Sequence, residues 1–252
     1  MTIDHSNHVC LIIPCYNEAK RLAIDSFLHF LNNTTYVNLL FVNDGSTDQT
    51  LETLQHICVT HKNAALLDLR TNVGKAEAVR LAILHALTLP YEYVGYFDAD
   101  LSTSLQESER MYQLLETEKE LMYVMGSRIA KLGNTIVRDK LRHYLGRGVA
   151  TFIDSFHLKL NTYDTQCGAK LIRSSLAKEL FQTPFVSRWL FDVEILSRIV
   201  GTFGREKTRK IVFEMPLKAW HHYKGSKINF KDLFRIPLDF LKIKKAYQLK
   251  NM

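Results

Sequence analysis

The chain has 252 residues, 46% of them hydrophobic and 23% charged, and a formal net charge of +7. A chain of this length and composition can bury a full hydrophobic core, which excludes a disordered, collagen-like or disulfide-stapled protein. The cysteines form no CxxC pair, so we expect neither a zinc site nor a disulfide framework.

The positive charge is unevenly placed along the chain. Residues 205–252 carry 13 Lys or Arg against 4 Asp or Glu, whereas residues 1–204 carry 20 against 22. A basic segment of this kind suits an anionic membrane, a nucleic acid or an acidic substrate, and charge alone does not choose between them. The N-terminus lacks the pattern of a signal peptide, and no apolar run approaches the roughly 18–20 residues of a membrane span. We therefore expect a soluble or peripheral protein in a reducing cytoplasm.

Short apolar runs alternate with segments of helical periodicity in the first part of the chain. The pattern predicts strands at residues 9–13, 37–42, 64–69 and 93–97, and helices at 18–32, 46–61 and 74–89. Pro14 is expected to end the first strand, and Ser46 is expected to cap the second helix in a capping box with Gln49. Strands alternating with helices of this length predict βαβ units and a mostly parallel sheet.

The second half of the chain is less regular. The sequence predicts strands at residues 121–125 and 211–215, and helices at about 139–157, 174–181 and 190–200. No repeat, low-complexity segment or Gly/Ser linker divides the chain, so we expect one continuous domain over residues 1–227.

The C-terminal segment, residues 228–252, has a different character. Apolar side chains follow one another at helical spacing, and basic side chains lie between them. Pro237 is expected to break or kink the segment. A basic amphipathic helix of this kind can lie in a membrane interface, or it can pack on the domain with its lysines in solvent. The two interpretations are compatible.

Polar residues follow all four strands that are expected in the first half. They occupy residues 16–18, 43–45, 72–75 and 98–100. One such cluster would be an ordinary turn, because turns are rich in Asn, Asp and Gly. In an open parallel sheet, however, ligands bind at the carboxyl ends of the strands. We therefore expect these four clusters to converge on one crevice.

Asp98 and Asp100 stand two residues apart, just after a hydrophobic strand. One or two carboxylates together with substrate phosphates are the ligands that Mg²⁺ prefers, and Mn²⁺ takes the same donors. The pair therefore predicts a site for Mg²⁺ or Mn²⁺. The dinucleotide and P-loop fingerprints, GxSxG and HExxH are absent, so Ser/His/Asp hydrolysis and zinc peptidase chemistry have no support.

Several blocks of the sequence together resemble a known family. The blocks LIIPCYNE, FVNDGSTDQT, NVGKAEAVRLAI, YFDADLST and VMGSR, in this order, resemble family 2 glycosyltransferases of the GT-A fold. The later blocks DTQCGAKL (164–171), RWLFDVEIL (188–196) and GSKI (225–228) resemble the dolichyl-phosphate β-glucosyltransferase branch, which is related to dolichyl-phosphate mannose synthases. The resemblance covers about residues 8–230.

The resemblance implies a single α/β domain of the GT-A (Rossmann-like) fold, with helices on both faces of the sheet. About residues 8–101 would bind the nucleotide sugar, and residues 102–227 would form the acceptor half. Asp98 and Asp100 match the family's DxD motif, with Asp100 as the metal ligand. The residues implied for binding the nucleotide sugar are Pro14, Tyr16, Glu18, Asp44, Lys75 and Asp98.

The activity implied is transfer of a sugar, with inversion, to a polyprenyl or dolichyl phosphate at the cytoplasmic face of a membrane. The expected donor is UDP-glucose, with GDP-mannose as the alternative, and the expected cofactor is Mg²⁺ or Mn²⁺. Guanidinium groups suit phosphate oxygens, so basic residues of the second half are candidates for holding the acceptor phosphate. These candidates are Arg128, Arg138, Arg142 and Lys227.

Other functions stay open at this point. A glycosyltransferase that uses a hydroxyl acceptor, in polysaccharide or glycolipid synthesis, would need a general base, and Asp192 is the candidate for that catalytic role. A nucleotidyltransferase also uses α/β sheets and carboxylate-bound metal, but the expected phosphate loop is missing. A non-catalytic module that binds membranes or nucleic acids is argued from charge alone. The DxD pair speaks against it, and we expect no nucleic-acid partner.

Overall fold

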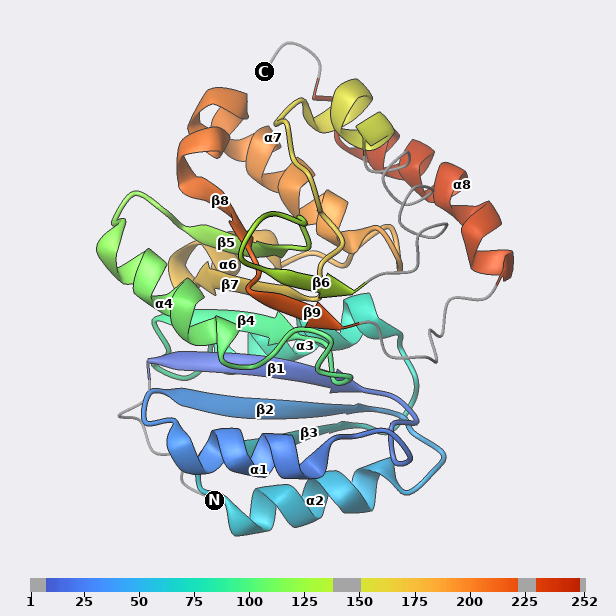
Figure 1. The fold of residues 1–252 in the computed structure, drawn as a ribbon. Coiled ribbons are helices and arrows are strands. Elements are labelled where there is room, and N and C mark those ends of the chain that lie inside the picture. Colours follow the sequence, from blue (N-terminus) through green and yellow to red (C-terminus); the bar gives the residue numbers. More distant parts are fainter. Residues whose placement is uncertain (1–7, 138–150, 222–229, 250–252) are drawn as a thin grey trace.

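The computed structural model of the chain describes residues 8–137, 151–221 and 230–249, and of residues 230–235 it describes only the backbone. A central sheet lies between two layers of helices (Figure 1). The strands are β1 (Val9–Cys15), β2 (Val37–Asp44), β3 (Ala64–Leu69), β4 (Tyr93–Phe97), β5 (Tyr123–Ser127), β6 (Thr135–Val137), β7 (Ala169–Arg173), β8 (Val212–Pro216) and β9 (Ala219–His221). The helices are α1 (Ile24–Asn33), α2 (Thr50–Thr60), α3 (Lys75–Ala86), α4 (Glu107–Thr117), the π-helix η1 (Asp154–Leu158), α6 (Ser174–Leu180), α7 (Phe191–Ile211) and α8 (Phe230–Ala246).

The main sheet has the strand order β3-β2-β1-β4-β7-β5-β8. The strands pair in parallel except for β7, which runs antiparallel to both of its neighbours, β4 and β5. The prediction of a mostly parallel α/β sheet is therefore confirmed. The short strands β6 and β9 form a separate parallel pair.

Both faces of the sheet are covered, and β1 shows why its sequence is apolar throughout. Val9, Leu11 and Ile13 pack with α1, α2 and α4, whereas Cys10 and Ile12 pack with α3, α6 and α7. Because a strand turns alternate side chains to opposite faces, a run buried on both sides contains no polar positions. This burial fixes the register of β1, and with it the place where the chain leaves the sheet.

Two expectations about the N-terminal helices are wrong. α1 begins at Ile24 rather than at residue 18, because side chains before and at the start of α2 hold the preceding turn. The Glu18 amide donates to Thr50 Oγ1 at 2.8 Å, and the Asn17 amide donates to Ser46 Oγ at 3.0 Å. Ser46 is thereby engaged across the chain, and α2 begins at Thr50 instead of being capped by Ser46.

Several other boundaries differ from the sequence-based expectation. β1 continues through Pro14, which pairs with Val42 of β2 beyond the last residue paired with β4, so its missing N–H costs no contact with β4. α8 continues through Pro237 rather than breaking there. The helix expected at 139–157 is observed over residues 151–158, and residues 138–150 lie outside the described part of the chain. Strands β6, β7 and β9 and helix α4 were not expected.

The helix α8 packs on the domain. Phe240 and Ile243 of α8 are buried in the same core as α7, and the ring of His157 lies edge-on to Phe240 at 5.8 Å between centroids. His157 Nε2 also lies 2.9 Å from Ser197 Oγ of α7. None of the helices within the described ranges is both long enough and apolar enough to cross a membrane. The division of the chain at residue 227 stays a prediction.

The buried ring of His157 makes folding sensitive to acid. Burial lowers the pKa of His157 from 6.5 to about 4, and the positive charges of Lys244 and Arg205 act in the same direction. Between these values the unfolded chain binds a proton that the folded chain does not, so stability falls as the pH decreases. We expect this residue to remove about 2 kcal/mol of unfolding free energy between pH 7 and pH 5.

Urea unfolding of the wild type and of His157→Gln at pH 7 and pH 5 measures this contribution. The wild type should lose about 2 kcal/mol more than the variant over this interval, whatever the variant's stability at pH 7. Equal losses in the two proteins would contradict a buried, neutral His157.

Candidate active site

The polar clusters after β2 and before α3 meet through the carboxylate of Asp44. Its oxygens accept the amides of Val73 at 2.7 Å and Gly74 at 3.0 Å, and the side-chain amide of Asn72 at 3.1 Å. Burial raises the pKa of Asp44, whereas the two backbone amides and the charge of Arg188 oppose the rise. The loop that leads into α3 is therefore fixed to the end of β2.

Lys75, the first residue of α3, forms an ion pair with Asp98 at the end of β4. Burial by itself would lower the pKa of Lys75, but the carboxylates of Asp98, Asp192 and Asp100 together raise it above its ordinary value. The Lys75 side chain keeps 38% of its surface exposed. A charged ammonium group thus stands at the edge of the site, where an incoming anion can reach it.

Asp98 is also in contact with the block DTQCGAKL. Its backbone amide donates to the carbonyl of Gly168 at 2.9 Å, just before β7 begins. A Cβ atom at position 168 would overlap the Asp98 carboxylate, so only glycine leaves room for that carboxylate. The antiparallel β7 therefore brings a glycine from the second half of the chain against the DxD motif.

Asp98 and Asp100 are the carboxylates that could hold a metal ion here. Asp100 Oδ1 accepts the amide of Ser102 at 2.9 Å, and both aspartates are partly exposed. Within the described ranges, no group of three or more His, Cys, Asp or Glu side chains could hold a metal. Two carboxylates fit Mg²⁺ or Mn²⁺ that takes its remaining ligands from substrate phosphates and water, and they do not fit a structural metal.

The first cluster lies at the same edge of the sheet. Glu18 is buried, and its Oε1 accepts a hydrogen bond from Arg21 Nη2 at 2.7 Å. The pKa of Arg21 is raised, first by the hydrogen bond with Glu18 and further by the charges of Asp100 and Asp98. The charges of the two aspartates thus act on the guanidinium that Glu18 holds. Pro14 is the sixth residue of β1, and Tyr16 follows that strand with 37% of its surface exposed.

Arg128 lies just beyond β5, on the acceptor side that the sequence predicts. Its Nε and Nη2 donate to the two carboxylate oxygens of Asp164 at 2.6 and 2.7 Å, and its guanidinium carbon lies 5.3 Å from the centre of the Trp220 ring. The positive charge of Arg128 outweighs burial and lowers the pKa of Asp164 to about 2. The pair is therefore ionised, and Arg128 has a fixed orientation with Nη1 directed away from Asp164. The other predicted acceptor residues, Arg138, Arg142 and Lys227, lie outside the described ranges.

Asp192 is buried at the start of α7. Its Oδ1 is 2.8 Å from Lys170 Nζ and also accepts the Tyr96 hydroxyl. Lys170 is fully buried and donates to the carbonyl of Thr165 at 3.1 Å. Asp192, the predicted general base, is therefore held in a buried ion pair with Lys170.

Sequence reasoning assigned no role to Arg21, Asp164, Lys170 or Arg188, although all four take part in these contacts. Asp164, Lys170 and Arg188 lie inside blocks that were matched to the family. A signal was therefore present, but the contact partners lie far away along the chain. Arg21 carries only the i,i+3 spacing from Glu18, which is too common on its own to indicate a site.

Comparisons with known proteins agree with the geometry. Residues 10–181 match the family model for glycosyl transferase family 2. The chain is 30% identical to dolichyl-phosphate beta-glucosyltransferase ALG5D of Trichomonas vaginalis over 259 residues, which cover 96% of this chain and 74% of that protein. It is 29% identical to the dolichyl-phosphate beta-glucosyltransferase of Saccharomyces cerevisiae over 269 residues, or 98% of this chain and 77% of that protein.

Solved structures share the architecture. Glucosyl-3-phosphoglycerate synthase from Mycobacterium tuberculosis, in complex with Mn²⁺ and UDP-glucose, superposes with a TM-score of 0.68 and covers 96% of this chain and 79% of that one. The sequences are 14% identical, so this likeness concerns the fold alone.

The contact between Gly168 and Asp98 offers a way to disturb the candidate metal site without replacing either carboxylate. Gly168→Ala would push the Asp98 carboxylate out of place, and we expect it to weaken Mn²⁺ binding in the presence of UDP by roughly 10- to 100-fold. Electron paramagnetic resonance of free Mn²⁺ measures the affinity.

Gly201→Ala is the matched control, because a Cβ atom there meets only Leu249 at 3.9 Å and the site lies in a helix. This control should bind Mn²⁺ as the wild type does. Unchanged Mn²⁺ binding in Gly168→Ala would show that Asp98 does not need its present position.

Proposed function

The chain belongs to glycosyl transferase family 2 and, within it, to the dolichyl-phosphate beta-glucosyltransferase branch, and on this premise we propose that it transfers glucose from UDP-glucose to a polyprenyl phosphate. The chain is a glycosyltransferase, so a non-catalytic binding module is set aside. The acceptor that we propose is dolichyl phosphate or a related polyprenyl phosphate. GDP-mannose is the alternative donor.

One structural observation carries the proposal: three strand ends, those of β2, β3 and β4, bring Asp44, Lys75, Asp98 and Asp100 together. A nucleotide sugar needs polar contacts for its base and positive charge for its diphosphate. Asp44, at the end of β2, and the start of α3 supply polar contacts for the base. Lys75 and a cation held by the aspartates supply positive charge for the diphosphate. The named relatives support glucose as the sugar, and the solved neighbours were crystallised with UDP-glucose and Mn²⁺.

Asp98 and Asp100 would hold Mg²⁺ or Mn²⁺, which when bound would neutralise charge on the departing diphosphate. Lys75 stands beside Asp98 and adds a fixed positive charge at the same place. The acceptor phosphate attacks from the opposite side of the sugar ring, so that the α-linked glucose of UDP-glucose becomes β-linked. One C–O bond to the diphosphate breaks as one C–O bond to the acceptor phosphate forms.

The surroundings of Asp192 favour a phosphate acceptor over a hydroxyl acceptor. A hydroxyl must lose a proton during attack, whereas a phosphate is already an anion near neutral pH and needs positioning and charge neutralisation. Asp192 is buried, and its Oδ1 already contacts Lys170 and Tyr96, so the structure gives this carboxylate a role in holding its neighbours. Arg128, whose Nη1 makes no hydrogen bond to a residue of the described ranges, is suited to contact the phosphate.

We propose further that the chain works as a peripheral protein on the cytoplasmic face of a membrane. Four apolar side chains are exposed on α8 and on the neighbouring helical turn, and we call them the apolar surface: Phe152, Phe156, Leu238 and Leu241. Phe152 contacts Phe156 and Phe240, which joins the two elements. The exposed lysines of α8, Lys242, Lys244 and Lys245, add the charge that anionic lipids attract.

Transfer of radiolabel from UDP-glucose to an organic-extractable lipid tests the activity. Purified protein, a polyprenyl phosphate and Mg²⁺ or Mn²⁺ should give labelled lipid, and mild acid should release the sugar, because a glycosyl phosphate is acid-labile. Asp100→Asn should lower the rate by roughly 100-fold or more, since it removes a charged metal ligand while keeping the shape.

Asp25→Asn is the matched control, because Asp25 is exposed in the first turn of α1 and forms no hydrogen bond or ion pair with a described residue of the site. It should keep the wild-type rate. Label that enters lipid but resists mild acid would favour a hydroxyl acceptor, and absence of label with UDP-glucose and GDP-mannose alike would contradict the proposal.

Sedimentation with lipid vesicles tests the apolar surface. Leu238→Ser together with Leu241→Ser should weaken binding to vesicles that contain phosphatidylserine by roughly 30- to 1,000-fold, because each leucine loses about 1–2 kcal/mol of burial in lipid.

Val59→Ser is the matched control, because Val59 is 72% exposed on α2 and lies outside the apolar surface. Wild-type binding by the double variant would exclude the apolar surface as the membrane contact.

A further inference from the structure

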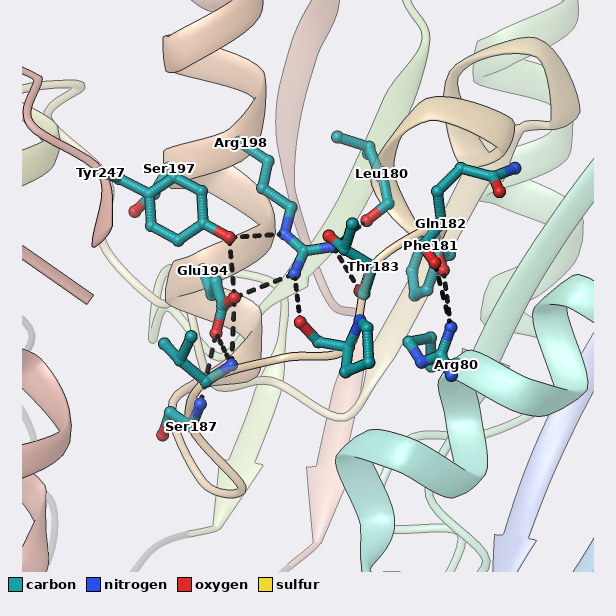
Figure 2. Close-up of polar contacts among 12 residues, drawn as sticks. Arg80, Leu180, Phe181, Gln182, Thr183, Ser187, Glu194, Ser197, Arg198 and Tyr247 are labelled. Atoms are coloured by element: carbon teal, nitrogen blue, oxygen red, sulfur yellow. Dashed lines mark hydrogen bonds and ion pairs between the residues drawn. The ribbon is translucent and has the colours of Figure 1, made fainter. Parts of the chain in front are cut away.

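The backbone of the loop between α6 and α7, residues 181–190, is held largely by charged side chains of other elements (Figure 2). Arg198 donates to the carbonyls of Thr183 and Pro184, each at 2.9 Å, and also to the carbonyl of Leu180. Arg80 of α3 donates to the carbonyls of Phe181 and Gln182 at 3.2 and 3.3 Å. Two arginines thereby occupy the carbonyls of the first half of the loop.

Glu194 and Tyr247 complete this arrangement. The Tyr247 hydroxyl accepts from Arg198 Nε at 2.9 Å and donates to Glu194 Oε1 at 2.8 Å, and Arg198 Nη2 lies 3.0 Å from the same oxygen. Glu194 is fully buried and Arg198 is 8% exposed. We call Glu194, Arg198 and Tyr247 the buried clamp. Figure 2 shows them between α7, the loop and the chain that follows α8.

The buried clamp fixes the backbone next to Arg188. Glu194 accepts the amides of Val186 at 2.9 Å and Ser187 at 3.3 Å. Ser187 Oγ accepts the amide of Leu190 at 2.9 Å and donates to Asp239 of α8 at 2.9 Å. Residues on both sides of Arg188 are therefore held, so the start of its side chain has little freedom.

Arg188 reaches back to the nucleotide end of the site. A Cβ atom at Gly74 would lie 2.5 Å from Arg188 Nη2 and 2.8 Å from Nε, so the guanidinium rests against the glycine that precedes Lys75. Its charge acts on Asp44. Arg188 is exposed, and its guanidinium makes no hydrogen bond to any residue in the described ranges. Within the described part of the chain, its donors are therefore unused and face a ligand that binds beside Gly74.

We propose that Arg188 binds the diphosphate of the nucleotide-sugar donor, and that the buried clamp positions it. The inference rests on the proposed function, because it assumes a donor with a diphosphate. A guanidinium with unused donors, beside Lys75 and the start of α3, matches phosphate oxygens in geometry and charge. A buried ion pair by itself contributes little to stability, so a positioning role accounts for a cluster of this size under a surface loop.

The donor is favoured over the acceptor because of the elements that Arg188 touches. Gly74 and Asp44 belong to the strand ends of the first half, which hold the nucleotide in our proposal. Arg128, the guanidinium on the acceptor side, lies at the end of β5, which is separated from β4 by β7.

Calorimetric titration with UDP and Mn²⁺ tests the role of Arg188. Arg188→Ala should weaken UDP binding roughly 10- to 100-fold, the effect expected for loss of a charge-assisted contact, and Arg188→Lys should recover only part of it. Arg209→Ala is the matched control, because Arg209 is an exposed arginine near the end of α7. This variant should bind UDP as the wild type does.

The positioning role is tested with Glu194→Gln and Tyr247→Phe, each alone and combined with Arg188→Ala. Each single change should raise the Kd for UDP and the KM for UDP-glucose about threefold to tenfold, with a smaller change in kcat. In the Arg188→Ala background neither should weaken UDP binding further, because a residue that acts through Arg188 has nothing left to position.

The outcomes separate the inference from the proposed function. If the wild type fails to bind UDP, the proposed function falls. If the wild type and Arg188→Ala bind UDP equally, or if Arg188→Ala raises only the KM for the polyprenyl phosphate, the donor role of Arg188 is overturned while the proposed function stands. Additive effects in the double variants would overturn the positioning role. Should the clamp variants fail to fold, the titrations of the Arg188 variants still decide whether Arg188 binds the diphosphate of the donor.

Discussion

The carboxylate of Asp98 lies between an ammonium group and a glycine, and the arrangement of the site depends on both neighbours. Lys75 at the start of α3 supplies the charge, and Gly168 just before β7 supplies the space. Lys75 begins the helix that follows the parallel strand β3, whereas Gly168 directly precedes β7, which runs antiparallel to β4. The antiparallel β7 thus brings the two halves of the chain together at Asp98, where we propose that the donor binds.

Charged pairs recur around this point, and most of them are shielded from water. Lys170 with Asp192 and Arg198 with Glu194 are buried pairs, and the buried Asp164 pairs with the partly exposed Arg128. The attraction within such a pair offsets little more than the free energy needed to remove its charges from water. Separating the two partners, however, would leave a buried charge without a partner, which strongly destabilises any other arrangement. Their common effect is to fix the segments that surround the strand ends.

The sequence predicted the parts of the molecule that depend on local pattern. The strand at 64–69 and the strand at 93–97 are observed as β3 and β4, and the strand-end clusters meet as expected. The failures have non-local causes. Ser46 is drawn away from α2 by the Asn17 amide, β7 is recognisable only through its pairing with β4 and β5, and Arg188 meets Gly74 across more than a hundred residues. No period or propensity along the chain encodes such contacts.

A crystal structure with UDP and Mn²⁺ tests the central claim most directly, namely that the ends of β1, β2 and β4 and the start of α3 form one donor site. The account predicts Mn²⁺ on Asp100 and on the diphosphate, with Asp98 and Lys75 alongside and the base near Asp44. A nucleotide bound away from these strand ends, or Mn²⁺ held without Asp98 or Asp100, would contradict it.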